Sequence, residues 1–290
     1  MIRLSKLKPY VMVAPALSFF LMFFIYPIFY MIRLSVTSWN FISPQKEFIG
    51  FNNYIELFTS EEFYQVLYNT LIYTVLTVGF SLVLAVLLAL WLNKQGTLYN
   101  IVQGAIFSPY IISLVSVALL WLWMMDPQYG LLNVVLELMG LPKSLWLTHP
   151  NTALFSLVIV GVWKVLGYNT LIVMAGLQSI PKDIYEAAEL DESNKWTTFY
   201  KITLPMLSPT IFFLLIVSTI SSFQVFDTVQ VMTQGGPINS TNMLVYYIFQ
   251  YGFDFFKIGY ASAAGVVLLV IVGIMTIFHF MFLSKHVYYR

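Results

Sequence analysis

Long apolar segments alternate along the chain with short polar ones. Six segments of about 20 residues hold at most one charged side chain each, and about 20 apolar residues suffice for a helix to cross roughly 30 Å of hydrocarbon. The pattern therefore predicts an all-α integral membrane protein, with residues 1–290 forming a single transmembrane domain. The predicted spans are residues 11–32, 70–92, 104–125, 153–177, 209–231 and 258–283.

Composition supports this interpretation and excludes several classes of function. The 290 residues are 59% hydrophobic and only 9% charged, whereas about a quarter of a soluble domain is charged. The net charge of +1 gives no basic field for nucleic acid. The absence of cysteine excludes disulfides and thiolate sites. The three histidines are scattered, so we expect no metal site, no catalytic residues and no enzyme activity.

The distribution of lysine and arginine predicts the orientation. If the N-terminus is cytoplasmic, nine basic residues lie inside and four outside, with Lys164 in the membrane. Cytoplasmic loops of membrane proteins are enriched in basic residues. Both termini and the loop at residues 179–208 are thus predicted to be cytoplasmic, in a multi-pass plasma membrane protein.

The outer segments carry structure of their own. Residues 51–68 show aromatic side chains at helical spacing, which predicts a short helix on the interface. Residues 126–152 contain repeated proline and glycine, with one short helix expected from Leu131 to Met139. Residues 233–242 are predicted to form a tight turn.

The loop at residues 179–208 is the most charged segment of the chain. Ser179 is expected to cap a helix that has Pro181 in its first turn and runs to about Glu192. A second helix is expected from Lys195 toward Leu204, separated from the fifth span by prolines. Two short helices would form a compact knob on the cytoplasmic side.

The residue order within this loop is specific. Glu186-Ala187-Ala188 is followed after three residues by Glu192, and after nine more by Ile202-x-Leu204-Pro205. This resembles the EAA loop of permeases of binding-protein-dependent ABC importers, in which glycine is usual at the position of Glu192. The stretches Ser108-Pro109-Tyr110, Gly176 to Pro181 and Thr233 to Pro237 are similar to those of the carbohydrate-uptake group, of the maltose, multiple-sugar or glycerol-3-phosphate type.

The resemblance implies the type I ABC importer permease fold in a bacterial or archaeal plasma membrane. It also implies a second related permease subunit, two copies of an ABC ATPase subunit and an extracellular solute-binding protein. The chain contains no G-x-x-x-x-G-K-[ST] loop, so we expect no bound cofactor here, with ATP and Mg²⁺ used by the partner. The residues expected to couple to the ATPase are Glu186, Ala187, Ala188, Asp191, Glu192, Leu204 and Pro205.

Polar groups within the spans are candidates for the substrate pathway. Lys164 and Asp227 either form an ion pair or act independently of each other. The positive charge of Lys164 leaves open the possibility that the substrate is an anionic sugar. A sugar site needs aromatic faces and short polar side chains, although serines in spans also allow close helix packing. The resemblance points to a set of cavity-lining residues on the third, fourth and fifth spans. They are Tyr110, Lys164, Val165, Tyr168, Ser218, Ser222, Val225, Gln224 and Asp227.

Two other functions remain to be weighed. A self-sufficient secondary transporter or channel for a small polar solute would show an inverted repeat or a chain of buried ionisable groups. An intramembrane enzyme would need a catalytic constellation within the spans. Neither pattern occurs, so the sequence favours the membrane-spanning subunit of an ATP-driven sugar importer.

Overall fold

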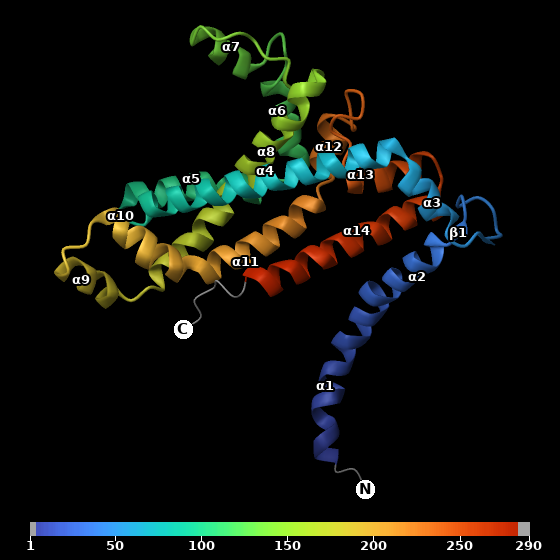
Figure 1. Ribbon diagram of the computed structural model, residues 1–290, viewed down its shortest axis with the longest axis horizontal. Coiled ribbons are helices and arrows are strands. Elements are labelled where there is room, and N and C mark those ends of the chain that lie inside the picture. Colours follow the sequence, from blue (N-terminus) through green and yellow to red (C-terminus); the bar gives the residue numbers. More distant parts are fainter. Residues whose placement is uncertain (1–3, 284–290) are drawn as a thin grey trace. The chain divides into compact units, whose positions relative to one another are not determined.

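The computed structural model describes residues 4–283 and is helical almost throughout (Figure 1). Within the described residues, five helices are long and apolar enough to cross a membrane. The number of candidate spans rises to six if one bent pair of helices is counted as a single span. The predicted all-α membrane fold is therefore confirmed. The basic residues Arg3, Lys285 and Arg290, used above to orient the termini, lie outside the described residues. Contacts divide the chain into two compact units.

The first unit comprises Met1–Phe63 and Tyr247–Val270. Its helices and strands include the first span, which contains a π-helical turn at Leu21–Ile25, and the beginning of the last span. The elements are α1 (Leu4–Phe20), α2 (Tyr26–Ser35), β1 (Thr37–Ser38), β2 (Glu47–Phe48), α3 (Asn52–Thr59) and α14 (Ile258–Phe278), with a π-helical turn at Gln250–Asp254. The predicted helix over 51–68 is wrong in extent, because α3 ends at Thr59 and the next helix begins at Glu61.

A small hairpin, absent from the sequence prediction, is fastened to the start of α14. Strands β1 and β2 pair antiparallel with Thr37 opposite Phe48. The backbone N–H of Ile258 donates to the Trp39 carbonyl at 2.9 Å, and the Asn53 amide donates to the Thr37 carbonyl at 2.9 Å. A Cβ on Gly259 would lie 1.8 Å from that same carbonyl oxygen, so only glycine permits this approach.

Three tyrosines of this unit, Tyr247, Tyr251 and Tyr260, contact one another. The hydroxyls of Tyr247 and Tyr260 lie 2.7 Å apart, and the Tyr251 hydroxyl donates to the Glu62 carboxylate at 2.9 Å. Burial, together with the Glu62 carboxylate, raises the pKa of Tyr251 to about 12. Tyr251 is therefore protonated, and able to donate this bond, over the physiological pH range.

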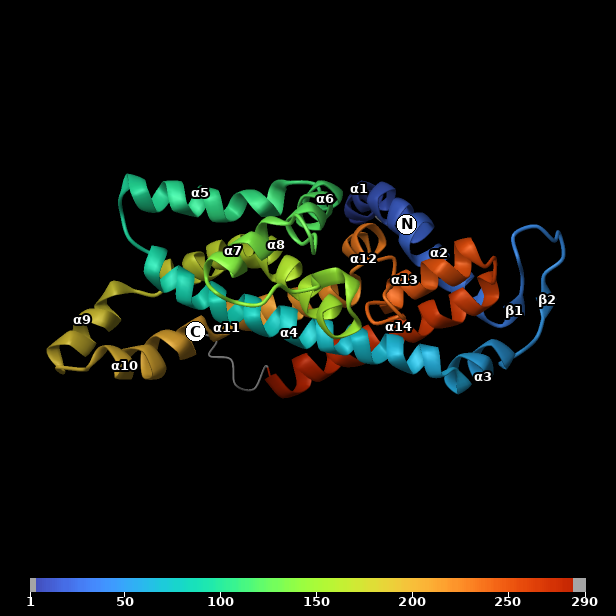
Figure 2. The same cartoon turned by 90° about the horizontal axis from the view of Figure 1, so that it is seen from above.

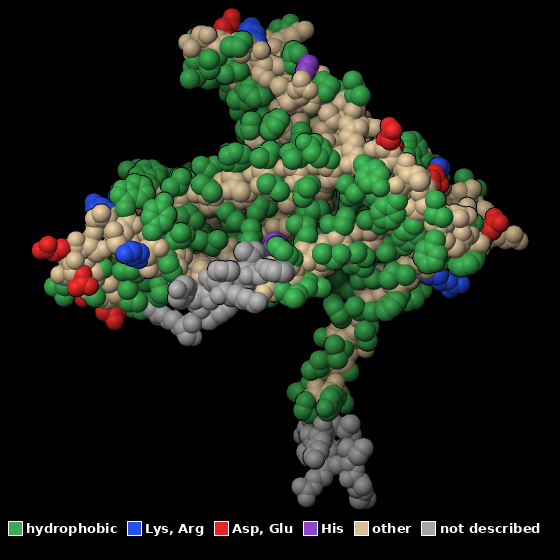
Figure 3. All heavy atoms as spheres, in the orientation of Figure 1, with side chains coloured by type: hydrophobic (Ala, Val, Ile, Leu, Met, Phe, Trp, Pro, Cys, Tyr) green, Lys and Arg blue, Asp and Glu red, His purple; other side chains and the backbone are tan. Residues whose placement is uncertain are grey.

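The second unit comprises Tyr64–Tyr246 and Ile271–Arg290. Four long helices, α4, α5, α8 and α11, run side by side in both views (Figures 1 and 2). On the face drawn in Figure 3, hydrophobic side chains cover these helices, while charged ones gather over α9 and α10. The helices are α4 (Glu61–Leu92), α5 (Thr97–Ile111), α6 (Leu114–Met124), α7 (Leu131–Leu138), α8 (Pro150–Gln178), α9 (Lys182–Leu190), α10 (Lys195–Thr198), α11 (Leu204–Phe223), α12 (Asp227–Met232) and α13 (Leu244–Phe249), with a 3₁₀ turn at Trp146–Thr148 and π-helical turns at Phe199–Thr203 and His279–Leu283.

Helix α8 is the centre of the second unit. Its buried Val173, Met174 and Leu177 share a core with side chains of α4 and α11. Two glycines let its neighbours approach: a Cβ on Gly161 would lie 2.4 Å from the Tyr73 hydroxyl of α4, and one on Gly167 would lie 2.1 Å from the Ile106 carbonyl oxygen of α5. These close approaches fix α4 and α5 against the middle of α8.

The third predicted span, residues 104–125, is not one straight helix. Helix α5 ends at Ile111 and α6 begins at Leu114, and the two are bent by 102°. Ile112 and Ser113 between them are extended, with ψ of 144° and 135°. The apolar run is continuous, so hydropathy gave no sign of the break. Figure 1 shows α6 and α7 leading away from the line of α5.

The fifth predicted span, residues 209–231, is displaced. Helix α11 begins at Leu204 and ends at Phe223, and Asp227 starts the separate helix α12. The prolines at 205 and 209 do not separate the loop from this span, because a π-helical turn at Phe199–Thr203 joins α10 to α11. Lys195–Phe223 therefore forms one helical stretch of 29 residues.

Two segments that were expected outside the membrane have the local structure predicted for them. Helix α7 occupies Leu131–Leu138, where a short helix was expected. The segment 233–242 is a turn, and the side chain of Asn69 on α4 holds it by donating to the carbonyls of Asn239 at 2.9 Å and Asn242 at 3.1 Å.

Candidate functional site

A pocket of about 240 Å³ opens among α4, α5, α8, α11 and the segment leading into α12. All nine residues predicted to line the substrate pathway border it. Their role as substrate contacts stays a prediction, because the pocket holds no ligand. They are Tyr110, Lys164, Val165, Tyr168, Ser218, Ser222, Gln224, Val225 and Asp227.

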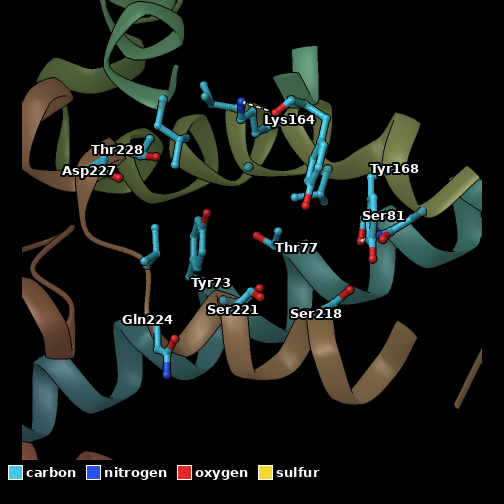
Figure 4. Close-up of a pocket in the computed structure, with 18 of the residues that line it drawn as sticks. Tyr73, Thr77, Ser81, Lys164, Tyr168, Ser218, Ser221, Gln224, Asp227 and Thr228 are labelled. Carbon is cyan, nitrogen blue, oxygen red and sulfur yellow. Dashed lines mark hydrogen bonds between the residues drawn. The ribbon is translucent and has the colours of Figure 1, made fainter. Parts of the chain in front are cut away.

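One wall of this pocket is formed by residues that were not predicted to line it. Tyr73, Thr77 and Ser81 of α4 border the space at intervals of four residues (Figure 4). That spacing places them on one face of a helix, and it was visible in the sequence. The second predicted span, residues 70–92, carries no charge, so charge alone does not indicate this wall. Asn169, Ser221 and Thr228 complete the polar lining that was not predicted.

Two aromatic rings form a flat surface in the pocket. Tyr110 from α5 stacks on Tyr168 from α8, with ring centroids 4.6 Å apart and an angle of 15° between the planes. Tyr110 is 42% exposed. The hydroxyl-bearing wall of α4 and the serines of α11 supply polar groups around this surface (Figure 4).

The ammonium of Lys164 binds backbone carbonyls. Its Nζ donates to the carbonyls of Pro109 at 2.7 Å and Tyr110 at 3.1 Å, and to that of Ile112. Figure 4 marks one of these bonds. Among the described residues, no ion pair joins Lys164 to Asp227. The sequence left open whether these two residues pair, and in this structure they do not form a salt bridge.

The charged loop forms a knob of two short helices, α9 and α10, next to the ends of α8 and α11. The predicted cap is wrong: Pro181 precedes α9, and the Ser179 hydroxyl donates to the Gly176 carbonyl at the end of α8. Asn194 caps α10 by accepting the Thr197 N–H at 2.8 Å. Of the seven predicted coupling residues, four are exposed, Leu204 and Pro205 are half-buried and Ala188 is buried.

Glu192 takes the position after α9 that glycine usually fills. Its φ is +53°. The N–H of Glu192 donates to the Glu189 carbonyl and that of Ser193 to the Ala188 carbonyl, both at 3.0 Å. This is the Schellman arrangement that ends many helices. The turn is therefore made here without glycine.

Three large side chains on the knob were not predicted as candidates. Leu190 is 86% exposed, Trp196 71% and Tyr200 59%. Trp196 and Tyr200 stack with centroids 6.2 Å apart. These side chains provide exposed apolar surface on the knob. The i, i+4 spacing of Trp196 and Tyr200 is visible in the sequence.

Comparison with known proteins identifies the family of this chain. Residues 81–286 match the family described as the binding-protein-dependent transport system inner membrane component. The chain belongs to this family. The resemblance stated from the EAA loop is thus confirmed, as is the assignment to the permeases of ABC transporters.

Several relatives of this permease cover nearly its whole length. The probable ABC transporter permease protein YesP of Bacillus subtilis (strain 168) is 36% identical over 294 residues, which cover 100% of this chain and 94% of YesP. The sn-glycerol-3-phosphate transport system permease protein UgpA of Yersinia pestis is 33% identical, covering 97% of this chain and 96% of UgpA. A bacterial ABC transporter involved in the import of the acidic polysaccharide alginate has a chain with TM-score 0.83 and 28% identity, covering 97% of this chain and 98% of that chain.

The permease shows no metal site within residues 4–283, where no group of three or more His, Asp or Glu side chains is placed to hold an ion. Its pocket provides aromatic surface and short polar side chains, which suit binding of a polar solute.

Proposed function

We propose that this chain is one of two membrane-spanning subunits of an ATP-driven sugar importer. It forms half of the translocation pathway, receives its substrate from an extracellular solute-binding protein, and couples through the EAA loop to a separate ATPase present in two copies. The observation that carries this proposal is that the pocket and the knob are joined by the same two helices.

Helix α8 leads from the pocket to the knob. It carries Lys164 and Tyr168 in the pocket and ends at Gln178, just before α9. At about 1.5 Å per residue, Tyr168 and Gln178 are roughly 15 Å apart along the helix. Helix α11 returns from the knob at Leu204 to the pocket at Ser218. Movement of the knob by an ATPase would therefore be carried to the pocket by two continuous helices.

The pocket fits half of a pathway. Its volume of about 240 Å³ lies below the roughly 300–1,000 Å³ of complete ligand sites, so a second permease would supply the remaining wall. The exposed apolar side chains of α1 and α2 leave a surface for lipid and for that subunit. UgpA is named for sn-glycerol 3-phosphate and the structural neighbour for alginate, and both names support a polyhydroxylated substrate.

The orientation follows from the same assignment. In this proposal the knob lies in the cytoplasm with the ATPase, and both termini are cytoplasmic. The chain has no ATPase activity of its own in this scheme, because hydrolysis belongs to the partner.

The coupling role is tested by reversing a charge on the knob. Glu186→Lys should reduce sugar import by at least about tenfold, since one lost charge contact costs over 1.4 kcal/mol, while the chain remains inserted in the membrane. The matched control is Glu189→Lys on the same exposed helix, which should retain import. Normal uptake by Glu186→Lys would rule out this assignment of the coupling residue.

The substrate role is tested at the stacked tyrosines. Tyr168→Ala should raise the KM for the transported sugar by about tenfold, as expected for loss of an aromatic contact, while the ATPase subunits still co-purify. Tyr168→Phe keeps the ring and should stay within about threefold of wild type. Loss of assembly in Tyr168→Ala, with Tyr168→Phe normal, would assign the ring to packing.

A further inference from the structure

The end of α5 is closed by a lysine from another helix. The last four carbonyls of a helix have no partner within it, and α5 ends where the chain bends by 102° into α6. No side chain caps α6 either. Within a bilayer no water is at hand to satisfy such carbonyls. From α8, the Lys164 ammonium binds two of these carbonyls, those of Pro109 and Tyr110, and also that of Ile112 just beyond α5, at the negative end of the α5 dipole.

The ammonium has no donor left for a substrate. A lysine carries three N–H donors, and the carbonyls of Pro109, Tyr110 and Ile112 accept all three. Lys164 is only 9% exposed. Binding a carboxylate or phosphate here would leave at least one of these carbonyls unpaired.

The hydrogen bonds of Lys164 also position the Tyr110–Tyr168 pair that forms the aromatic surface of the pocket. One of them goes to the backbone of Tyr110, whose ring stacks on Tyr168 at 4.6 Å. Tyr168 follows Lys164 by one helical turn on α8. At Gly167, between them in sequence, the α5 backbone approaches α8 too closely for a Cβ. Lys164 and Gly167 thus fix α5 at two points, and the tyrosine pair lies beside them.

Apart from Lys164, the described lining of the pocket contains one ionisable acidic or basic side chain, that of Asp227. The lining includes Lys164 and Asp227 but no arginine, glutamate or histidine. Asp227 is half-buried in the first turn of α12. Lys164 keeps its charge, but its donors are engaged by carbonyls, so Asp227 is the ionisable group of this lining that is left to contact a solute directly.

We propose that Lys164 is a positioning residue that fixes the α5–α6 break and the Tyr110–Tyr168 pair, and that this half of the pathway accordingly accepts uncharged saccharides in preference to anionic ones. The choice of substrate class rests on the proposed function, since it takes the pocket as the path of the sugar. It separates this chain from relatives whose names specify a phosphate or an acidic polysaccharide.

The positioning role is tested by a distance measurement that needs no substrate. The chain has no cysteine, so spin labels on Ile101→Cys in α5 and Leu119→Cys in α6, both exposed, report the break alone. With the full chain in lipid nanodiscs, double electron–electron resonance spectroscopy should give one narrow distribution of the distance between the two labels. Lys164→Met should broaden or shift it, and Lys164→Arg, which keeps several donors, should restore it.

The control and a milder variant keep this test decisive. Lys143→Met removes an exposed lysine paired with Glu137 and should leave the distribution unchanged. If Lys164→Met does not fold, Lys164→Gln, which retains two N–H donors, should give an intermediate width. An unchanged distribution in a folded Lys164→Met or Lys164→Gln variant would overturn the positioning role.

The charge preference is tested with thiol reagents of opposite charge. The thiol of a Ser221→Cys variant in the pocket should react with a trimethylammonium-bearing methanethiosulfonate about tenfold faster than with its sulfonate analogue. Both rates are normalised to Thr148→Cys at an exposed site. Faster reaction with the sulfonate, lost on Lys164→Met, would make Lys164 an anion receptor and overturn the proposal. Failure of the assembled importer to move sugar would instead refute the proposed function and leave both measurements standing.

Discussion

At the scale of single residues, Glu192 holds a backbone conformation that glycine adopts more readily. Its φ of +53° lies in the left-handed region, which costs a side chain roughly 1 kcal/mol. Glu192→Gly should therefore stabilise the end of α9 by about 1 kcal/mol and slow exchange of the Glu192 and Ser193 amide hydrogens about fivefold. Hydrogen exchange followed by mass spectrometry measures this in the purified protein.

Glu189 supplies the control for that measurement. It is exposed in the last turn of α9, where its backbone is still helical and glycine is unfavourable by up to about 1 kcal/mol. Glu189→Gly should speed exchange of the same amides. Equal effects of the two substitutions would mean that the conformation at Glu192 carries no cost.

Residue patterns predicted part of the pocket and missed another part for a physical reason. The spacing of Ser218 and Ser222 follows from helix geometry, so their shared face was correctly expected. The partners of Lys164 are carbonyls more than 50 residues away in the chain. Every residue has a carbonyl, and only the break between α5 and α6 leaves these three without partners. Sequence alone offered Asp227 as the partner because it shows charges and no helix ends.

At the scale of elements, the packing of α5 on α8 depends on Gly167. A methyl group there would lie 2.1 Å from a backbone oxygen of α5, which cannot move aside as a side chain can. Gly167→Ala should destabilise the protein by about 2–3 kcal/mol and lower its unfolding temperature by several degrees. Thermal unfolding of the purified chain in detergent, followed by size-exclusion chromatography, measures the shift.

Gly104 on α5 is the matched control. No atom lies within 4 Å of a Cβ placed there, so Gly104→Ala should be neutral or stabilising by up to about 1 kcal/mol. If both substitutions lower the unfolding temperature equally, the cost comes from the helix itself and the close approach at Gly167 has no special weight.

The positions of the elements followed from hydropathy, while their breaks did not. Five of the six predicted spans contain one long helix, because a continuous apolar run both spans a bilayer and favours helix. The break at Ile112–Ser113 lies inside such a run. Lys164 binds the carbonyls of Pro109, Tyr110 and Ile112 beside the break, and no local residue pattern encodes that tertiary contact. The fifth span shifted for a similar reason, since a π-helical turn allowed helix to continue through Pro205.

At the scale of the whole molecule, the excess of basic residues on one side predicts which surfaces share a compartment. A single thiol of Glu189→Cys in the knob should be labelled by a membrane-impermeant maleimide only after spheroplasts are opened. The thiol of Lys143→Cys in the outer loop should be labelled in intact ones. The cysteine-free sequence gives no background. The opposite pattern would invert the orientation and place the knob out of reach of a cytoplasmic ATPase.

Dependence on partner chains is the last property that belongs to the whole molecule. The pocket is smaller than a complete site, and the chain lacks a phosphate-binding loop. Reconstituted alone in liposomes, it should therefore transport no sugar under any ion gradient, whereas adding the second permease, the ATPase, the solute-binding protein and ATP should start uptake. Liposomes with the complete set but with Glu186→Lys are the control for uncoupled leakage, and they should remain inactive. Uptake by the isolated chain driven by a sodium or proton gradient would identify a secondary transporter, because then the energy would enter through the ion and the knob would have no mechanical role.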